Sequence, residues 1–506
     1  MNADVEFARV SGTYFHNGKY VAAPDARQHS VIDPSRNLTM GHFPEVGTTE
    51  IDTVVVTANR SQTHWHQKSA LERAELLHEV AADIRTLRAE FGELLTRETG
   101  KPFKESVDEM LWSASAVDYY AELGRHSIGS VLGSTVAGQT HYTIKEPMGT
   151  VVSIVPANFP ILLMIWSAAA ALAAGNSVII KPSEGASLTT LSFMRVFDRL
   201  PHGLVQCVTG GADAGKHLVS HHDTHMVAFT GSVASGQAVA RTCAKMFKPY
   251  IIEASGSDAF IVMPSAPLDI AARGATFASF LNCGQVCTSA EKILVHEDVY
   301  DEFVEKFLVN VAALRIGHGL DKVDIGPMET ARERDRVERV LARAVEQGGT
   351  VLAGGKRPDL DGHLSDGFFF EPTVLADLTD DMDIFSQEVF GPIAPIYRVS
   401  SFEEAISITN KSPMGLGATL YSTDVVEIQR ATTEVVAGMV WINAPLLDND
   451  AGPFGGRKLS GIGRQLGAEG LDSFRHTKLV MIDPGASIQD FWWFPYSEDE
   501  SFSAST

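Results

Sequence analysis

The sequence predicts an α/β protein built on mainly parallel β-sheet, because short strand-like runs alternate with helical ones along most of its length. The clearest stretch covers residues 150–246, where four β-branched runs are each followed by a helical pattern. The alternation restarts at residue 250 and continues to about residue 444, which predicts a second α/β region. Strands separated by single helices form βαβ units with parallel strands. Ligands of such sheets bind beyond the carboxyl ends of the strands, so the loops after the four runs are the first candidates for a functional site.

Each element has its own signal in the sequence. Residues 1–60 are mixed and rich in turns, whereas residues 50–98 have helical spacing, with apolar side chains from Leu71 to Leu87 on one face, ending before Gly100. Alternating or β-branched runs predict strands at residues 140–145, 150–155, 177–180, 203–209, 225–229 and 292–295. Apolar or amphipathic spacing predicts helices at residues 106–123, 161–174, 188–200, 214–220, 234–246, 270–280, 299–314 and 330–346.

Composition excludes several classes of protein. The 506 residues are 44% hydrophobic and 21% charged, which is ordinary for a globular chain and excludes disorder or low complexity as a description of the whole. The net charge of −22 disfavours nucleic acid and anionic membrane surfaces as partners. The longest nearly apolar run, residues 161–174, is shorter than the ~20 residues that span a bilayer, and the first residues do not resemble a secretory signal. We therefore expect a soluble, cytoplasmic protein with no membrane partner.

Three patterns imitate functional motifs. Residues 210–216 (GGADAGK) nearly match a phosphate-binding loop, but His217 stands where the magnesium-binding hydroxyl belongs, so the segment is interpreted as a glycine-rich turn. His217, His221, His222 and His225 cluster without a His-Glu-x-x-His pattern, and Cys283 and Cys287 lack zinc-site spacing. We predict no metal site.

Three further residues are candidates for chemistry. Cys287 follows a Gly-Gln pair rather than lying inside an apolar run, so it is either a buried structural cysteine or a nucleophile. Asn158 follows a predicted strand and either caps the next helix or donates a hydrogen bond to an oxyanion. Glu253 directly follows apolar strand residues, where it is either an edge glutamate or a general base whose pKa is raised by desolvation.

Taken together, these segments resemble the NAD(P)-dependent aldehyde dehydrogenase superfamily over about residues 31–482. Seven motifs occur in the family's order, which makes chance agreement negligible. They are residues 156–160 (PANFP), 173–176 with 181–184 (AAGN, KPSE), 229–232 with Gly236 (FTGS), 253–256 (EASG), 284–287 (GQVC), 387–392 (QEVFGP) and 453–456 with 460–464 (PFGG, SGIGR).

The resemblance implies a Rossmann-like cofactor domain, a second α/β catalytic domain and a small β-flap oligomerisation domain. The corresponding ranges are 1–128 with 147–254, then 255–474, then 129–146 with 475–486, followed by a C-terminal tail at 487–506. It also implies NAD-dependent oxidation of a small-molecule aldehyde to the acid, and a homodimer or homotetramer. We expect the aromatic cluster in the tail to pack on a neighbouring subunit near its substrate entrance, since it would otherwise be an exposed apolar patch.

The resemblance gives each residue a role. Cys287 would attack the aldehyde and form a hemithioacetal and then a thioester, Asn158 would stabilise the oxyanion, and Glu253 would activate the hydrolytic water. Cofactor binding falls to Pro156, Lys181, Glu184, Thr230, Gly231, Ser232, Glu388 and Phe390. Because a carboxylate on the adenosine ribose repels a 2′-phosphate, Glu184 favours NAD over NADP.

The same resemblance outlines a substrate pocket, which would be lined by Phe159, Trp166, Val286, Thr288 and Phe454, with residues 445–450 as one wall. Its apolar lining with Asp448 and Asp450 nearby disfavours an aldehyde that bears a carboxylate. Aliphatic, aromatic and amino-aldehydes stay open.

The chain also departs from the family pattern. Ser167 and Gln465 stand where many hydrolytic members have a lysine and a glutamate, so both ends of a proton relay are replaced by uncharged groups. Ala254 and Ser255 replace a common Leu-Gly pair beside the predicted base, and Ala157 replaces a frequent aromatic residue. We predict that hydrolysis of the thioester depends on Glu253 and water alone.

Two alternatives remain within the same fold. A CoA-acylating semialdehyde dehydrogenase would generally lack the base glutamate, which Glu253 supplies here. A non-catalytic binding or structural protein would be free to lose Cys287, Asn158 or Glu253, and all three are present.

Overall fold

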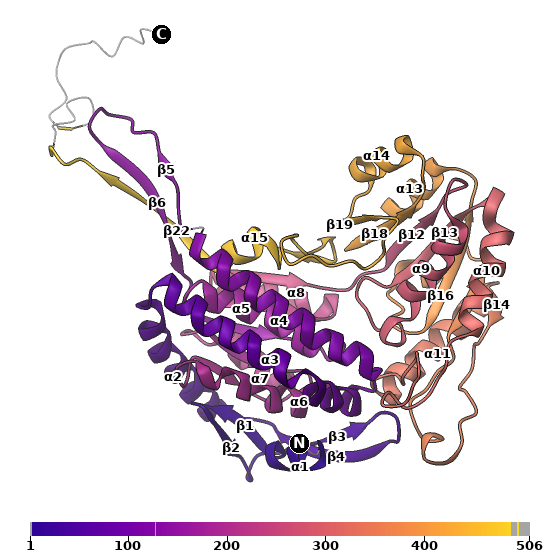
Figure 1. Ribbon diagram of the computed structural model, residues 1–506, viewed down its shortest axis with the longest axis horizontal. Coiled ribbons are helices and arrows are strands. Elements are labelled where there is room, and N and C mark those ends of the chain that lie inside the picture. Colours follow the sequence, from indigo (N-terminus) through magenta and orange to yellow (C-terminus); the bar gives the residue numbers. More distant parts are fainter. Residues whose placement is uncertain (1–2, 127, 487–492, 495–506) are drawn as a thin grey trace, which may run out of the picture.

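Two mainly parallel sheets form the body of the protein, which we describe from a computed structural model covering residues 3–126, 128–486 and 493–494 (Figure 1). The first sheet of this described chain has eight strands and the second has seven. The predicted α/β class is therefore confirmed. The first sheet runs, in spatial order, β2 (Lys19–Ala22), β1 (Thr13–His16), β9 (Val205–Cys207), β8 (Ser177–Lys181), β7 (Thr150–Ile154), β10 (Met226–Thr230), β11 (Tyr250–Glu253) and β21 (Gly461–Ile462).

The strands β9, β8, β7, β10 and β11 are mutually parallel, so their carboxyl ends meet at one edge of the sheet. The connecting helices cover its two faces (Figure 1). These helices are α2 (Thr48–His66), α3 (Ala70–Thr99), α4 (Phe103–His126), α5 (Pro160–Ala173), α6 (Ser187–Phe193), α7 (Ala212–Ser220) and α8 (Val233–Lys245).

The second sheet is parallel except at its β14 edge. Its order is β14 (Thr350–Ala353), β15 (Thr373–Ala376), β16 (Ile393–Val399), β13 (Ala290–His296), β12 (Asp258–Val262), β18 (Gly417–Tyr421) and β19 (Met439–Ile442). The helices of this region are α9 (Leu268–Phe280), α10 (Tyr300–Ala312), α11 (Ala331–Glu346), α12 (Asp383–Ser386), α13 (Phe402–Lys411) and α14 (Val425–Glu434).

A three-stranded sheet of β22 (Arg475–Ile482), β6 (Thr140–Pro147) and β5 (Val131–Leu132) projects from the body as an arm (Figure 1). Several of its apolar side chains are exposed, among them Val131 (86%) and Met481 (56%). The smaller elements are α1 (Ala3–Val10), the hairpin β3 (Gln28–Asp33) and β4 (Leu38–Pro44), the pair β17 (Met414–Gly415) and β20 (Arg457–Lys458), and α15 (Gly467–Asp472).

Local sequence explains where the long helices begin and end. The helix α3 begins at a capping box, in which Ser69 and Glu72 satisfy each other's backbone amides, and it ends at Gly100 with a left-handed φ of 81°. Proline at the first position of α5 is compatible with helix, because that N–H has no intrahelical partner. Every residue of α5 is buried, as its uniformly apolar sequence predicts.

Some predicted boundaries are wrong. The helical spacing over residues 50–98 is two helices, α2 and α3, because Ser69 caps a new helix instead of continuing the first. The predicted helix 188–200 ends as α-helix at Phe193 and continues as 3₁₀ turns over Met194–Arg199. The predicted strand 203–209 is ordered as a strand only over Val205–Cys207.

The domain ranges stay a prediction, with one feature that crosses them. The strand β21 lies within the range 255–474 but pairs with β11 in the first sheet, and Glu253 lies opposite Gly461. No helix of the described residues is long and apolar enough to cross a bilayer. Most of the aromatic tail lies outside the described residues. The two residues of the tail that are described, Trp493 and Phe494, are 53% and 81% exposed.

Candidate active site

Cys287 lies at the end of a tightly turned loop between α9 and β13. Three consecutive residues of this loop, Asn282, Cys283 and Gly284, have left-handed φ angles of 49°, 57° and 71°. Non-glycine residues adopt this conformation only where the surroundings impose it, and such positions cluster at functional sites. Gly256 allows the close approach of the loop, because a methyl group there would lie 1.8 Å from the carbonyl oxygen of Cys287.

Exposure distinguishes Cys287 from the other cysteines. Cys207, Cys243 and Cys283 are buried, whereas Cys287 is partly exposed. Its side chain is reached from two sides, since it lines one cavity of about 590 Å³ and another of about 430 Å³. A nucleophile at the junction of two cavities is placed to meet two different ligands.

Asn158 joins Cys287 at this junction, because it lines both cavities as well. It lies between β7 and α5, two residues before the first residue of α5, so it lies beyond the carboxyl edge of the first sheet. Its Nδ2 donates one hydrogen bond to the carbonyl of Gln285 (3.0 Å), and Asn282 Nδ2 donates to the Asn158 carbonyl (3.1 Å). An amide has two N–H groups, so one donor of Asn158 remains for a ligand.

Glu253 ends β11 at the same edge of the sheet and is 3% exposed. Neither of its carboxylate oxygens accepts a side-chain hydrogen bond among the described residues, and a backbone amide, that of Gly456, faces the carboxylate. Burial raises the pKa of Glu253 well above its ordinary value, and the charge of Arg464 and the Gly456 amide only partly oppose this shift. Buried carboxylates with so few partners are rare in folded proteins, so this one is consistent with a functional group.

The larger cavity is lined by residues from both α/β regions. From the first region come Pro156, Thr230, Gly231 and Ser232, and from the second come Glu388 and Phe390. Ser232 caps α8 by accepting a hydrogen bond from the amide of Ser235 (3.3 Å), so a helix N-terminus faces this side of the site. A helix N-terminus carries partial positive charge and favours phosphate.

Glu388 is connected to the cysteine loop through Gly256, whose amide donates to its Oε1 (3.2 Å). Burial and the neighbouring Glu291 raise the pKa of Glu388 to about 8. Glu291 in turn accepts hydrogen bonds from the amides of Val389 and Phe390 (2.9 and 2.7 Å). Sequence reasoning missed Glu291, whose only signal is that it stands beside Lys292 at the start of a strand with an apolar centre.

Lys181 and Glu184 lie farther along the carboxyl edge. Lys181 lines a third cavity of about 460 Å³ between α7 and α8, and its Nζ donates to the carbonyl of Pro182 (3.0 Å). Glu184 is not part of the lining but borders it at Gly211, where an added methyl group would lie 3.1 Å from Glu184 Oε1. Six of the predicted cofactor residues thus line the larger cavity, Lys181 lines its neighbour, and Glu184 lies beside that neighbour.

The five predicted pocket residues, Phe159, Trp166, Val286, Thr288 and Phe454, all line the cavity of about 430 Å³. The predicted wall of residues 445–450 also lines it, except for Asn449. Trp166 and Phe454 pack against each other, with ring centroids 4.8 Å apart. Sequence reasoning missed further lining residues, because their direction on a helix or loop is set by tertiary packing: Trp112, Ser115, Leu162, Leu163, Phe277 and Leu281.

A buried ion pair that sequence reasoning also missed supports the Asn158 segment. Lys101 Nζ and Glu109 Oε2 lie 2.5 Å apart with both side chains fully buried. The other oxygen of Glu109 accepts from the amides of Ile161 and Leu162 (2.9 and 3.1 Å), at the start of α5. The ammonium of Lys101 lies 3.7 Å from the centre of the Phe159 ring.

Replacing Glu109 by alanine is expected to lower the free energy of unfolding by about 3–5 kcal/mol, because it leaves a buried ammonium without its counter-charge. Denaturant unfolding measures the loss. The double variant Lys101→Met with Glu109→Leu removes both charges and should be more stable than Glu109→Ala. Equal instability of the two would show that the ion pair is not the cause.

Electrostatics at the thiol oppose ionisation. Burial, followed by the carboxylates of Asp258, Glu388, Glu253 and Asp448, raises the pKa of Cys287 well above its ordinary value. The thiol is therefore neutral near pH 7 in the free protein. Any ligand that brings positive charge into either cavity would favour the thiolate.

The two residues that replace the family's proton relay, Ser167 and Gln465, lie inside the protein. Ser167 Oγ shares a hydrogen bond with Ser153 Oγ (2.6 Å) and donates to the carbonyl of Met164 (3.0 Å). Gln465 is 1% exposed, and its side-chain oxygen has no partner among the described residues. Neither residue carries a charge, so neither leaves an unpaired ion in the core.

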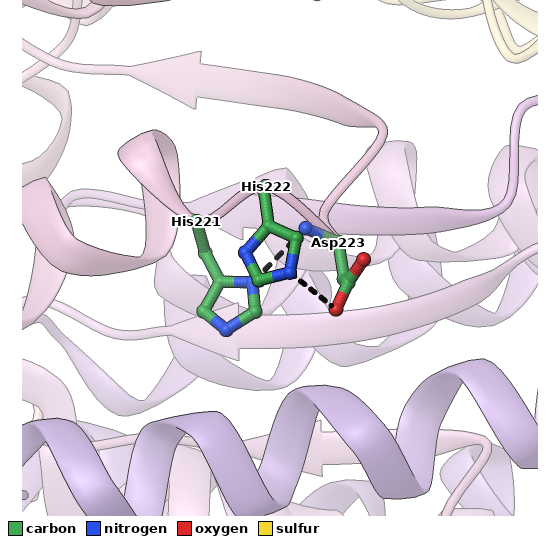
Figure 2. Close-up of side chains that lie close together, drawn as sticks. All are labelled: His221, His222 and Asp223. Carbon is green, nitrogen blue, oxygen red and sulfur yellow. Dashed lines mark hydrogen bonds and ion pairs between the residues drawn. The ribbon is translucent and has the colours of Figure 1, made fainter.

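The histidine cluster lies away from the cysteine. Figure 2 shows His221, His222 and Asp223, whose ligand-type atoms lie within 4.8 Å of one another. His221 Nδ1 already accepts from the Asp223 amide (3.1 Å), His222 Nε2 pairs with the Asp223 carboxylate (3.1 Å), and the two rings stack at 4.9 Å. These residues precede the amino end of β10, opposite the edge where Thr230 lies. The absence of a metal from the reaction stays a prediction.

The interpretation of residues 210–216 as a glycine-rich turn is correct only for Gly210 and Gly211, because residues 212–216 are the first residues of α7. Lys216 is exposed and pairs with Asp213 (2.9 Å) at the rim of the third cavity. Its ammonium is therefore held on the surface.

Comparison with known proteins agrees with this arrangement. The family model described as "Aldehyde dehydrogenase family" matches residues 20–480. The chain is 34% identical over 472 residues to 3-sulfolactaldehyde dehydrogenase of Pseudomonas putida, covering 92% of this chain and 96% of the relative. It is 32% identical over 477 residues to betaine aldehyde dehydrogenase of Bacillus subtilis, covering 93% and 97%.

Solved structures of aldehyde dehydrogenases are also similar to this chain. The NAD⁺ complex of aldehyde dehydrogenase from Bacillus cereus superposes with a TM-score of 0.92 at 32% identity, over 96% of this chain and 99% of that one. Relatives named for NADP⁺ occur as well, among them an Escherichia coli succinate-semialdehyde dehydrogenase. The chain therefore belongs to the aldehyde dehydrogenase family, and the protein is an aldehyde dehydrogenase.

Proposed function

We propose that this enzyme oxidises an aldehyde to the carboxylic acid with NAD, through a thioester on Cys287 that water hydrolyses. The observation that supports this most directly is that Cys287 and Asn158 both line the two cavities. An aldehyde in the smaller cavity and a nicotinamide in the larger one would meet at the same sulfur.

The first step is attack of the Cys287 thiolate on the aldehyde carbon. The developing oxyanion would be stabilised by the free N–H of the Asn158 amide and by the backbone N–H of Cys287. Removing one such donor costs about 3 kcal/mol of barrier in comparable sites. Because Lys101 and Glu109 hold the segment that carries Asn158, this donor is fixed before the substrate arrives.

The larger cavity suits a dinucleotide by the chemistry of its lining. The N-terminus of α8, with Thr230, Gly231 and Ser232, would hold the pyrophosphate, and Glu388 would accept from ribose hydroxyls beside Phe390 and Pro156. When bound, NAD supplies the acceptor for the hydride that leaves the hemithioacetal.

Release of the acid requires water activated next to the thioester. Glu253, buried and without an ion-pair partner within salt-bridge distance, has the raised pKa that suits a general base. This favours hydrolysis over transfer to CoA, which does not need a base at this position. It equally speaks against a non-catalytic role, because an unpaired buried carboxylate costs stability and needs a functional reason.

Glu184 supports a preference for NAD. Its carboxylate borders the cavity lined by Lys181, where the adenosine ribose would lie. Replacing Glu184 by serine is expected to raise kcat/KM with NADP about tenfold relative to NAD, since the charge that repels the 2′-phosphate is removed. Steady-state kinetics with both cofactors measures the ratio. An unchanged ratio would mean that another residue sets the preference.

The experiment that tests the proposed function is a panel of aldehydes with NAD and with NADP, followed through reduction of the nicotinamide. Acid formation is measured by product analysis with and without CoA. Reduction that depends on CoA would favour the acylating alternative, and no reduction with any aldehyde would contradict the proposal.

We further propose that the arm mediates a homodimer or homotetramer, because its exposed apolar residues, including Val131, Leu479 and Met481, would be covered there. A cytoplasmic location stays a prediction.

A further inference from the structure

The substrate cavity has an unusual charge for a site that accepts small aldehydes. Asp448 and Asp450 both line it, and no lysine or arginine does so among the described residues. Burial and the neighbouring Asp450 raise the pKa of Asp448 to about 7, and a cation bound beside it would stabilise its charged form.

The rest of the cavity wall is aromatic. Trp112, Phe159, Trp166, Phe277 and Phe454 all contribute to it. The faces of aromatic rings attract cations, and desolvated cation–π contacts are stronger than exposed ones. Aromatic walls and carboxylates therefore favour the same kind of ligand.

The Asp450 carboxylate and the backbone of the loop before Asp448 are held in place before a ligand binds. Asp450 Oδ2 accepts a hydrogen bond from Ser115 Oγ on α4 (2.5 Å), and the Asp450 carbonyl accepts from the amide of Gly467 (2.9 Å). The carbonyl of Leu447 accepts from Trp441 Nε1 (2.9 Å), which anchors the loop just before Asp448. A charged side chain that is already fixed loses less conformational entropy when a ligand binds to it than a mobile one does.

The inner end of the cavity independently indicates a ligand. Asn158 is 8% exposed, and its side-chain oxygen has no partner among the described residues. It lies with Cys287 on the wall of the same cavity. An aldehyde group fits this inner end, and its substituent would extend toward Asp448 and Asp450.

We propose that the preferred substrates are aldehydes carrying an ammonium group, with Asp448 and Asp450 as the residues that recognise the cation. This rests on the proposed function, since it names the substrate class of the same site. Relatives of similar sequence identity are named for different substrates, some for an anionic aldehyde and others for a cationic one. The proposal states which of these two kinds of aldehyde this enzyme prefers.

The test compares matched substrates on the intact enzyme with NAD. Betaine aldehyde and 4-trimethylammoniobutanal are each paired with the neutral aldehyde in which carbon replaces nitrogen, and succinic semialdehyde supplies the anionic case. We expect kcat/KM for at least one cation to exceed that of its neutral partner about tenfold or more, and the anion to be poorest. In Asp448→Asn with Asp450→Asn, the ratio of cation to neutral partner should fall toward one.

Asp359→Asn with Asp361→Asn is the matched control, because both residues are exposed and lie outside the cavity, so the same two charges are lost without a change in the ratio. Equal kcat/KM for cation and neutral partner in the wild-type enzyme would overturn the inference. It would leave the proposed function intact, whereas failure to oxidise every aldehyde of the set would contradict the proposed function itself. If the double variant does not fold, the wild-type ratios still decide.

Discussion

Replacing Cys287 by alanine is expected to abolish aldehyde oxidation, with a fall in kcat of about 10⁴-fold or more. Loss of a covalent nucleophile removes the whole reaction path, and losses of this size are typical of such variants. The measurement is reduction of NAD with the best aldehyde of the panel. Cys287→Ser tests the nucleophile more finely, because the weaker hydroxyl nucleophile should restore little or no activity.

The neighbouring cysteine supplies the matched control. Cys283 is buried four residues earlier in the same loop, and its Sγ contacts Met328 Sδ (3.8 Å). Cys283→Ala should retain activity within a few-fold, since that side chain lines neither of the two cavities that meet at Cys287. Thermal stabilisation by NAD should persist in Cys287→Ala. Activity that survives in Cys287→Ala but is lost in Cys283→Ala would contradict the assignment.

The raised pKa of Cys287 adds a pH dependence to this prediction. The free enzyme should react slowly with iodoacetamide at pH 7 and faster as the pH rises, because only the thiolate is nucleophilic. Two of the four acidic groups that oppose the thiolate also line the cavities, Glu388 the larger one and Asp448 the smaller one. The oxidised nicotinamide and an ammonium-bearing aldehyde would therefore each favour ionisation of the sulfur.

One geometric rule lets the sequence predict that the proposed catalytic residues lie near one another. Asn158 and Glu253 each follow a strand of the same parallel sheet, and parallel strands end at one edge. Chain order and strand type were enough to expect that neighbourhood, and the family motifs added Cys287 and Glu388 from the second region.

Residues whose role depends on tertiary contacts could not be predicted from the sequence. In the sequence, Lys101 belongs to a Gly-Lys-Pro segment that ends a helix. Nothing in the local sequence shows that its ammonium faces Phe159, 58 positions later. Trp112 and Phe277 lie on α4 and α9, so their place in the lining of the proposed substrate cavity depends on how these two helices are packed. The pairing of β21 with β11 likewise joins segments about 210 residues apart, which no local pattern specifies.

Replacing Glu253 by glutamine is expected to lower the steady-state kcat about 10²–10³-fold while leaving one rapid turnover of NAD reduction per site. Without the base, attack and hydride loss proceed but the thioester accumulates, so rapid mixing should show a burst followed by a slow phase. Glu297→Gln, at an exposed glutamate, is the matched control.

The acid limb of the pH profile gives a second, independent measurement of Glu253. Burial raises its folded-state pKa well above 4.5, so the base becomes protonated, and kcat falls, at a pH well above that value. That limb should disappear in Glu253→Gln. Stability should change in the opposite sense, because a raised carboxyl pKa costs folding free energy as the pH rises above the unfolded-state value, and glutamine removes that cost. A normal steady-state rate in Glu253→Gln, with no burst, would show that another group activates the water despite the neutral Ser167 and Gln465.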